Sequence, residues 1–352
     1  MQVKPRKRIL IAPLNWGLGH ATRCIPLINA LILYNFEPII ASDGDALQLL
    51  KLEFPNLQTL TLPSYNITYA QKGKSLKLKL LKDTPHILKT IQREKKLILA
   101  FVKREAIDGI ISDNRFGVRH KKLPCVFLTH QLKVLSGATT WLSSKIHQNI
   151  ISKFNECWVP DYAGSNNISG DLGHTKTSNY TLKYIGPLSR FEKQNHSYKY
   201  NILVLLSGPE PQRGYLETIL LEELKLYDGK ILFVKGTVEN EQIIVVKNNI
   251  TIYNFMTSAH LNTALNESDL VISRSGYTTI MDLAKLEKKA FFIPTPGQFE
   301  QEYLAKKIKQ EGIAYNCKQD DFKIELLAET KHYSGFKSYG FESDFKDLFS
   351  LF

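Results

Sequence analysis

Residues 14–23, LNWGLGHATR, place two glycines and a histidine where a buried strand is expected to give way to a helix. Gly17 and Gly19 permit backbone angles that other residues resist, and they let another molecule approach closely. The N-terminus of a helix presents free N–H groups and a partial positive charge, which favour anions. His20 has an ordinary pKa near neutrality, so it is a candidate general base. The stretch therefore predicts a ligand-binding turn that carries a proton acceptor.

Two stretches in the second half of the chain offer groups suited to phosphate oxygens. In residues 205–214, LLSGPEPQRG, a strand is followed by an exposed loop with a hydroxyl, free N–H groups and a guanidinium. In residues 269–284, DLVISRSGYTTIMDLA, a strand leads through a turn into a helix whose first groups would face an anion. The residues predicted to bind such a ligand are Ser207, Gly208, Gln212, Arg213, Arg274, Ser275, Gly276, Thr278 and Thr279. Plain helix capping is the alternative for each motif taken alone.

Groups suited to sugar hydroxyls follow in the same half of the chain. Asp282 lies one turn into the helix, where its carboxylate can accept hydrogen bonds from a ribose. Residues 294–305, PTPGQFEQEYLA, come after a further strand and offer Gln298, Gln301 and Glu302. Three turns at three successive strand ends predict one site that binds phosphate, ribose and sugar.

The elements that must position these residues alternate between short buried strands and helices, which is typical of a doubly wound parallel sheet. A polar stretch at residues 185–200 predicts a linker, and the same alternation restarts after it. The predicted fold class is α/β, with two Rossmann-like, doubly wound parallel-sheet domains that face a cleft. The expected bounds are 1–184 for the N-terminal domain, 185–200 for the linker, 201–333 for the C-terminal domain and 334–352 for a C-terminal helix.

The charge of the chain is concentrated in its first half. The formal net charge is +12, and residues 72–104 alone contain 11 Lys and Arg against Asp83 and Glu94. The apolar residues of this run are close to a helical stripe, so it fits a helix on an anionic membrane surface or a helix packed on its own domain. Few aromatics are interleaved with the basic residues, so no binding to nucleic acid is expected.

No stretch is long and apolar enough to span a membrane. We expect no signal peptide, because residues 1–16 lead directly into the first predicted strand. We therefore expect a cytoplasmic protein that can lie on the inner face of the plasma membrane through residues 72–104. Asp43-Gly44-Asp45 matches a metal-binding Asp-x-Asp pattern, but a turn fits it better because nothing nearby supports a metal.

Together these motifs resemble the GT-B glycosyltransferases, most closely the branch that adds N-acetylglucosamine to the lipid-linked precursor of peptidoglycan. The resemblance covers most of the chain and rests on Gly-x-Gly-His at 17–20, Ser-Gly-x-x-x-Gln-Arg at 207–213, Arg-Ser-Gly-x-x-Thr at 274–279 and Gly-Gln-x-x-Gln-Glu at 297–302. It implies a nucleotide-sugar donor, usually a UDP-sugar, in the C-terminal domain and the acceptor in the N-terminal domain. It also implies that no metal or other cofactor is needed, and that the final helix packs back on the N-terminal domain.

The sequence departs from that branch at several positions. Asp282 replaces the family's glutamate on the ribose, and Gln301-Glu302 replaces its pair of glutamines. SDNRFG, residues 112–117, has no recognisable counterpart there. These differences imply a related glycosyltransferase with another acceptor and a donor sugar that can also differ, a hexose or an N-acetylhexosamine.

The expected reaction moves a sugar from a UDP-sugar to a lipid-linked or other anionic acceptor, with inversion. His20 is the predicted base and Asp113, at the end of another strand, is its rival. Ser207, Arg213 and the helix that begins at Thr278 are expected to stabilise the leaving diphosphate. The alternatives are a UDP-sugar epimerase of the same fold, and a non-catalytic binder of nucleotide sugars or nucleic acid.

Overall fold

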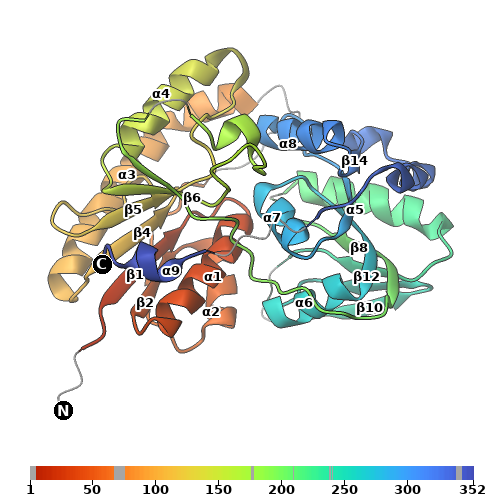
Figure 1. The fold of residues 1–352 in the computed structure, drawn as a ribbon, viewed down its shortest axis with the longest axis horizontal. Coiled ribbons are helices and arrows are strands. Elements are labelled where there is room, and N and C mark those ends of the chain that lie inside the picture. Colours follow the sequence, from red (N-terminus) through yellow and green to blue (C-terminus); the bar gives the residue numbers. More distant parts are fainter. Residues whose placement is uncertain are drawn as a thin grey trace. The chain divides into compact units, whose positions relative to one another are not determined.

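The computed structural model describes residues 5–66, 76–175, 178–208, 210–237, 239, 241–337 and 343–352. Within them the chain divides into two compact units (Figure 1). Of the described residues, the first unit contains those of 5–66, 80–188 and 343–352, and the second contains those of 76–79 and 189–337. Between Tyr184 and Tyr200, where the sequence predicts a linker, there is neither helix nor strand, and the units divide after Leu188.

The first unit is built on a parallel sheet of seven strands in the order β3-β2-β1-β4-β5-β6-β7. Its apolar runs are buried on both faces, as a covered parallel sheet requires, and Ile9 to Ala12 are 0% exposed. The strand order reverses between β1 and β4, which makes this the switch point of the sheet. The strands are β1 (Arg8–Pro13), β2 (Glu37–Ser42), β3 (Thr59–Thr61), β4 (Gly109–Asp113), β5 (Cys125–Leu128), β6 (Glu156–Val159) and β7 (Thr181–Tyr184).

The second unit repeats this architecture, with the order β10-β11-β9-β8-β12-β13-β14 and a switch point between β8 and β12. All its pairs are parallel except β10 with β11, which form an antiparallel hairpin at one edge. The strands are β8 (Tyr200–Leu205), β9 (Ile231–Val234), β10 (Ile244–Lys247), β11 (Ile250–Tyr253), β12 (Ser268–Ser273), β13 (Lys289–Phe292) and β14 (Tyr315–Asn316). The prediction of two doubly wound parallel-sheet domains is confirmed.

Helices connect the strands in both units. They are α1 (Gly19–Leu33), α2 (Gly44–Glu53), α3 (Leu76–Arg104), α4 (Thr140–Ile151), α5 (Gln212–Glu223), α6 (Ser258–Asn266), α7 (Tyr277–Lys285), α8 (Phe299–Gln310) and α9 (Phe345–Phe349). Short 3-10 helices are η2 (Gly137–Thr139), η3 (Gly170–Leu172), η4 (Leu224–Leu226), η5 (Gln319–Asp321) and η6 (Ile324–His332). One expectation is wrong here, because Gln212 and Arg213 form the first turn of α5 rather than part of an exposed loop.

The C-terminal helix is much shorter than the predicted 334–352. It begins where the Asp344 side chain accepts a hydrogen bond from the backbone N–H of Asp347, and it ends at Phe349, just before the end of the chain. Phe349 and Phe352 pack against Trp158 and belong to the core cluster around α1 and α2. The end of the chain thus lies on the first unit, as Figure 1 shows with α9 in blue beside the red α1.

The basic run lies on α3, and the side chains of residues 84–104 are described. Ile98 is buried and Val102 packs against the same core cluster, whereas Lys95, Lys96 and Lys103 are exposed. Part of the apolar stripe in this half of the helix therefore belongs to the domain core, whereas Leu88 and Leu99 are 56% and 53% exposed. Lys72 and Lys74 fall outside the described residues. No helix among the described residues is both long and apolar enough to cross a membrane.

Candidate functional site

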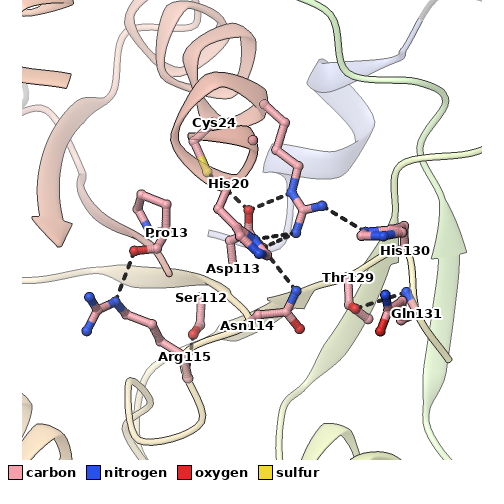
Figure 2. Close-up of polar contacts among 12 residues, drawn as sticks. Pro13, His20, Cys24, Ser112, Asp113, Asn114, Arg115, Thr129, His130 and Gln131 are labelled. Atoms are coloured by element: carbon pink, nitrogen blue, oxygen red, sulfur yellow. Dashed lines mark hydrogen bonds and ion pairs between the residues drawn. The ribbon is translucent and has the colours of Figure 1, made fainter. Parts of the chain in front are cut away.

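The histidine and the aspartate predicted as rival bases meet at the switch point of the first sheet (Figure 2). Asp113 ends β4, and the neighbouring β1 leads through residues 14–18 to α1, whose second residue is His20. Gly17 has a φ of 76°, so the turn uses the left-handed backbone that glycine adopts freely. His20 Nδ1 lies 2.9 Å from Asp113 Oδ1. Parallel strands end at the same edge of the sheet, which is why the two side chains meet.

A third residue, Arg23, completes this cluster, and the sequence analysis missed it. Its Nε donates to Asp113 Oδ2 at 2.6 Å, its Nη2 donates to Asp113 Oδ1, and its Nη1 lies 2.8 Å from His130 Nδ1. Arg23 is 1% exposed and Asp113 is 0% exposed. The spacing of three residues between His20 and Arg23 on one helix was a signal that could have identified it. His130, which follows β5, has no comparable local signal.

The contacts within this cluster give the two candidate bases, Asp113 and His20, different protonation states. Burial alone would raise the pKa of Asp113, but the charges of Arg23 and His20 and their hydrogen bonds outweigh it and hold that pKa well below its usual range. Burial lowers the pKa of His20, with Arg23 adding to the effect and Asp113 opposing it. Asp113 is thus a buried, permanently ionised partner, and His20 is neutral near pH 7. His20, whose side chain is 14% exposed, is the group that a substrate can reach.

The hydrogen bonds of His20 allow two tautomers. With the proton on Nδ1, His20 donates to Asp113 and Nε2 carries the lone pair. With the proton on Nε2, Nδ1 accepts from Arg23 Nη2, which lies 2.8 Å away. The full negative charge of Asp113 favours the first tautomer. Since Nε2 makes no hydrogen bond within the described part of the chain, it is the nitrogen available to a substrate.

A second charged network lies on the other side of the same segment, where Arg115 points away from Asp113 toward Pro13 (Figure 2). Arg115 is 0% exposed, and its guanidinium donates to Pro13 O at 2.9 Å, to Glu94 Oε1 at 2.8 Å and to Asp43 Oδ1. It connects the loops after β1, β2 and β4 to α3. Asp43 is committed to this ion pair. It directly precedes α2, which begins at Gly44, so Asp43-Gly44-Asp45 opens a helix and does not form the predicted turn. The motif SDNRFG therefore serves two networks through Asp113 and Arg115.

Arg274, predicted to bind a diphosphate, has a different role in the second unit. It is 1% exposed, and its guanidinium donates to Ile293 O at 3.0 Å, Gln212 O at 2.8 Å and Gln319 Oε1 at 2.6 Å. It therefore joins the segments that follow β8, β12 and β13, three neighbouring strands. The prediction of direct contact by this side chain is corrected, because its donors are directed at the protein itself.

Several other predicted side chains also hold the loops together. The Ser275 hydroxyl donates to Gln301 O at 2.8 Å, and Gln301 Oε1 accepts from Thr295 N at 2.8 Å. Glu302 Oε1 accepts from Gly297 N at 2.9 Å. The remaining member of this turn, Gln298, occupies the N-cap position of α8, without a capping hydrogen bond from its side chain. The three segments are thus preorganised by hydrogen bonds among themselves.

The turn into α7 leaves a helix N-terminus and a buried carboxylate. Gly276 is extended at the N-cap, followed in the first turn by Thr278, which is buried, and Thr279, which is half-buried. Asp282 is 7% exposed and accepts a hydrogen bond from Ser189 Oγ at 2.7 Å. Burial raises the pKa of Asp282 to about 7, although Arg190 and Ser189 oppose the shift. Ser189 lies in the predicted linker and was missed.

The loop after β8 is the most open of the three. Gly208 has a φ of 96°, and a Cβ built there would meet nothing within 4 Å. Ser207 beside it is half-buried. Arg213, expected near a diphosphate, instead donates to Lys235 O at 3.1 Å and pairs with Glu210. Among the described residues there is no cluster of His, Cys, Asp and Glu that could hold a metal ion.

Comparisons with known proteins identify glycosyltransferases as similar to this chain. Residues 217–333 match the model of the glycosyltransferase family 28 C-terminal domain. Over 284 residues, 76% of this chain and 75% of the relative, the sequence is 23% identical to the UDP-N-acetylglucosamine–N-acetylmuramyl-(pentapeptide) pyrophosphoryl-undecaprenol N-acetylglucosamine transferase of Haemophilus ducreyi.

Two solved structures are similar in fold. The glycotransferase of kitacinnamycin has a TM-score of 0.62 at 13% identity, with 93% of this chain and 90% of that chain covered. MurG of Acinetobacter baumannii has a TM-score of 0.54 at 15% identity, with 95% and 96% covered. At these identities the two structures establish the fold and nothing finer.

Proposed function

Because this chain is a nucleotide-sugar glycosyltransferase with the GT-B fold that resembles MurG, we propose that it transfers a hexose or N-acetylhexosamine from a UDP-sugar to a lipid-linked or other anionic acceptor. The observation that carries the proposal is the convergence of three preorganised segments at the carboxyl ends of β8, β12 and β13. Ligands of open α/β sheets bind at this edge. A UDP-sugar epimerase is not favoured, since the matched family and the H. ducreyi relative are transferases.

In this proposal the second unit holds the donor. The backbone N–H groups at the start of α7 and at Gly208 donate hydrogen bonds to the diphosphate, which the helix dipole favours. Asp282 accepts hydrogen bonds from the ribose. The loop of Gln298, Gln301 and Glu302 lies beside the sugar. The diphosphate leaves without a metal, stabilised by these N–H groups and by Ser207.

The first unit supplies the base. His20 Nε2 takes the proton from the acceptor hydroxyl as its oxygen attacks the anomeric carbon and the bond to the diphosphate breaks. Asp113 orients the imidazole and stabilises the imidazolium that forms, and Arg23 keeps Asp113 ionised. A direct attack of this kind inverts the anomeric configuration.

The first prediction concerns the donor site. Asp282→Ala is expected to weaken UDP and UDP-N-acetylglucosamine binding by roughly 10- to 100-fold, since a hydrogen bond to a charged group contributes about 1.5–3 kcal/mol. Isothermal titration measures this directly. Asp228→Ala is the matched control, because Asp228 is exposed just before β9, at the opposite end of the strands. Equal affinity in wild type and Asp282→Ala would place the ribose elsewhere.

The proposal about the acceptor rests on the positive charge of α3. The exposed lysines of α3 lie on the same unit as His20, and an anionic acceptor or membrane surface attracts them. Ile98, Phe101 and Val102 of α3 pack on the core, and Leu88 and Leu99 are exposed as single residues among the lysines, so we attribute the attraction mainly to charge. We infer a peripheral enzyme on the cytoplasmic face of the membrane.

The second prediction tests this attraction. The wild type is expected to cosediment with vesicles that contain anionic lipid, and binding should weaken as salt is added. Replacing Lys89, Lys95, Lys96 and Lys103 with Glu should abolish it, because each well-placed lysine contributes about 1 kcal/mol. Neutral vesicles are the control. A wild type that ignores anionic vesicles at low salt would point to an acceptor free in solution.

A further inference from the structure

The edge strand β10 presents an apolar surface that neither the donor site nor the base explains. Residues 241–248 are exposed without interruption. They include four consecutive branched side chains, with Ile243 53%, Ile244 52%, Val245 41% and Val246 68% exposed. Isolated apolar residues are common on surfaces, but a run of four on one edge strand is a site for pairing with another chain.

The backbone of β10 is open on one side. Ile243 O accepts a hydrogen bond from Asn254 N at 3.2 Å, so Ile243 faces β11. Backbone groups alternate in direction along an antiparallel strand, so Val245 and Lys247 also face β11, whereas Ile244 and Val246 direct theirs away from the sheet. Within the described residues β10 has β11 as its one neighbour. Ile244 and Val246 thus offer N–H and C=O groups at the rim.

The other edge strands in the described structure do not combine an exposed apolar run with a backbone that is open over several residues. β3 and β14 have three and two residues, too short for an extended ladder. β7 carries Lys183, which pairs with Glu156, and three of its four residues are half-buried. Short edges and edge lysines are the usual protection against unwanted pairing. β10 has an apolar run at its centre and its one lysine at the end.

We propose that β10 pairs antiparallel with β10 of a second copy of this chain, about a two-fold axis at Val245. This register places Ile244 opposite Val246 of the second copy, and Val246 opposite Ile244. These are the residues whose backbone groups point outward, and directly opposite residues of this kind exchange two hydrogen bonds. The same surface is used on both copies, as a two-fold interface requires.

The charges at the ends of the strand agree with this register. Glu241 and Lys247 are both exposed, and neither has an ion-pair partner in the part of the chain that the structure describes. With Val245 on the axis, Ile243 lies opposite Lys247 of the second copy, and Glu241, in the bend that leads into β10, becomes the diagonal neighbour of that lysine. Diagonal neighbours lie within reach of long side chains. A parallel arrangement would bring like charges together, so the charges select the antiparallel one.

The interface is small, which determines how the assembly behaves. A single strand pair with its side chains buries less than the roughly 1,200 Å² of a stable complex. The dimer therefore exchanges with monomer, and its population depends on protein concentration. No residue of the donor turns or of the cluster around His20 lies in β10, so association leaves the site chemistry intact.

Sedimentation equilibrium of the full chain, from low micromolar to several hundred micromolar protein, tests the proposal. The wild type should move toward twice the chain mass, and Val246→Lys should weaken association at least tenfold, about 1.4 kcal/mol. Leu226→Lys is the matched control, since Leu226 is 71% exposed on η4. Glu241→Lys and Lys247→Glu should each weaken the dimer, and the double variant should restore it. Hydrogen exchange at the Ile244 and Val246 amides should slow as the wild type associates.

Unchanged far-UV circular dichroism and donor affinity would establish that each variant is folded. A wild type that remains monomeric at the highest concentration overturns the proposal. So does a dimer that persists in Val246→Lys, because it must use another surface. Failure of the double charge variant to restore association would reject the antiparallel register. None of these results bears on the donor site.

Discussion

Replacing His20 with alanine lowers kcat by roughly 10²–10⁴-fold, the usual contribution of a general base, while the affinity for UDP stays unchanged. The reason is that in the proposed mechanism His20 acts on the acceptor proton, whereas the second unit binds the donor. Initial rates with saturating donor, together with titration of UDP, measure both quantities. His196→Ala is the matched control, because His196 is exposed in the segment between β7 and β8.

The pH profile strengthens this test. Burial and Arg23 lower the pKa of His20, so the rise in kcat/KM with pH is expected below the ordinary histidine pKa of about 6.5. Asp113→Asn removes the charge that favours the imidazolium, so the rise should move to still lower pH as the rate falls. A change in KM alone on replacing His20 would contradict its role as base and assign it to substrate positioning.

Replacing Arg115 with methionine destabilises the protein by about 3–5 kcal/mol, because it leaves two buried carboxylates without their counter-charge. Asp43 is 6% exposed and Glu94 is 0% exposed. Chemical denaturation measures the loss, and Arg104→Met is the control, since that side chain is 70% exposed. The loss should be larger at pH 8 than at pH 5. Burial already raises the pKa of Glu94 against the opposing charge of Arg115. Without Arg115 this pKa rises further, and protonation of Glu94 at low pH reduces the cost of burying it.

A second comparison separates charge from packing. The triple variant with Arg115→Met, Asp43→Asn and Glu94→Gln should recover a large part of the stability, since neutral groups are much less costly to bury. If the triple variant is no more stable than Arg115→Met, the arginine acts through its packing and its bonds to Pro13 O and Pro63 O.

The local units of the fold could be predicted from the sequence, because they depend on neighbouring residues. The strand that ends before Leu14 and the helix around Ile25 follow from apolar periodicity, and so does the restart of the pattern near residue 200. His20 and Asp113 could be proposed separately because each lies at a strand end. The length of the C-terminal helix was overestimated. Phe349 and Phe352 pack around Trp158 from a short helix and the irregular end of the chain, and not from one face of a long helix.

What could not be predicted is how side chains use their hydrogen bonds. Arg213 and Arg274 have the same chemical character in the sequence, and both looked suited to phosphate. The structure directs Arg274 at the backbone of segments up to 62 residues away, a fact set by the packing of three strands. Arg23 meets Asp113 across 90 residues of sequence. Such pairings depend on the strand order, which a single sequence does not specify.

The position of Arg274 also bears on how the proposed donor site can change during evolution or in the laboratory. One guanidinium holds the segments after β8, β12 and β13 in a common arrangement. If one loop alone were transplanted from a related enzyme, its carbonyl groups would be placed for the neighbours it had there. They would not match the guanidinium of Arg274. Altered donor specificity is therefore more accessible through exchange of the three segments together, or through point changes at side chains outside this arrangement, such as Thr279.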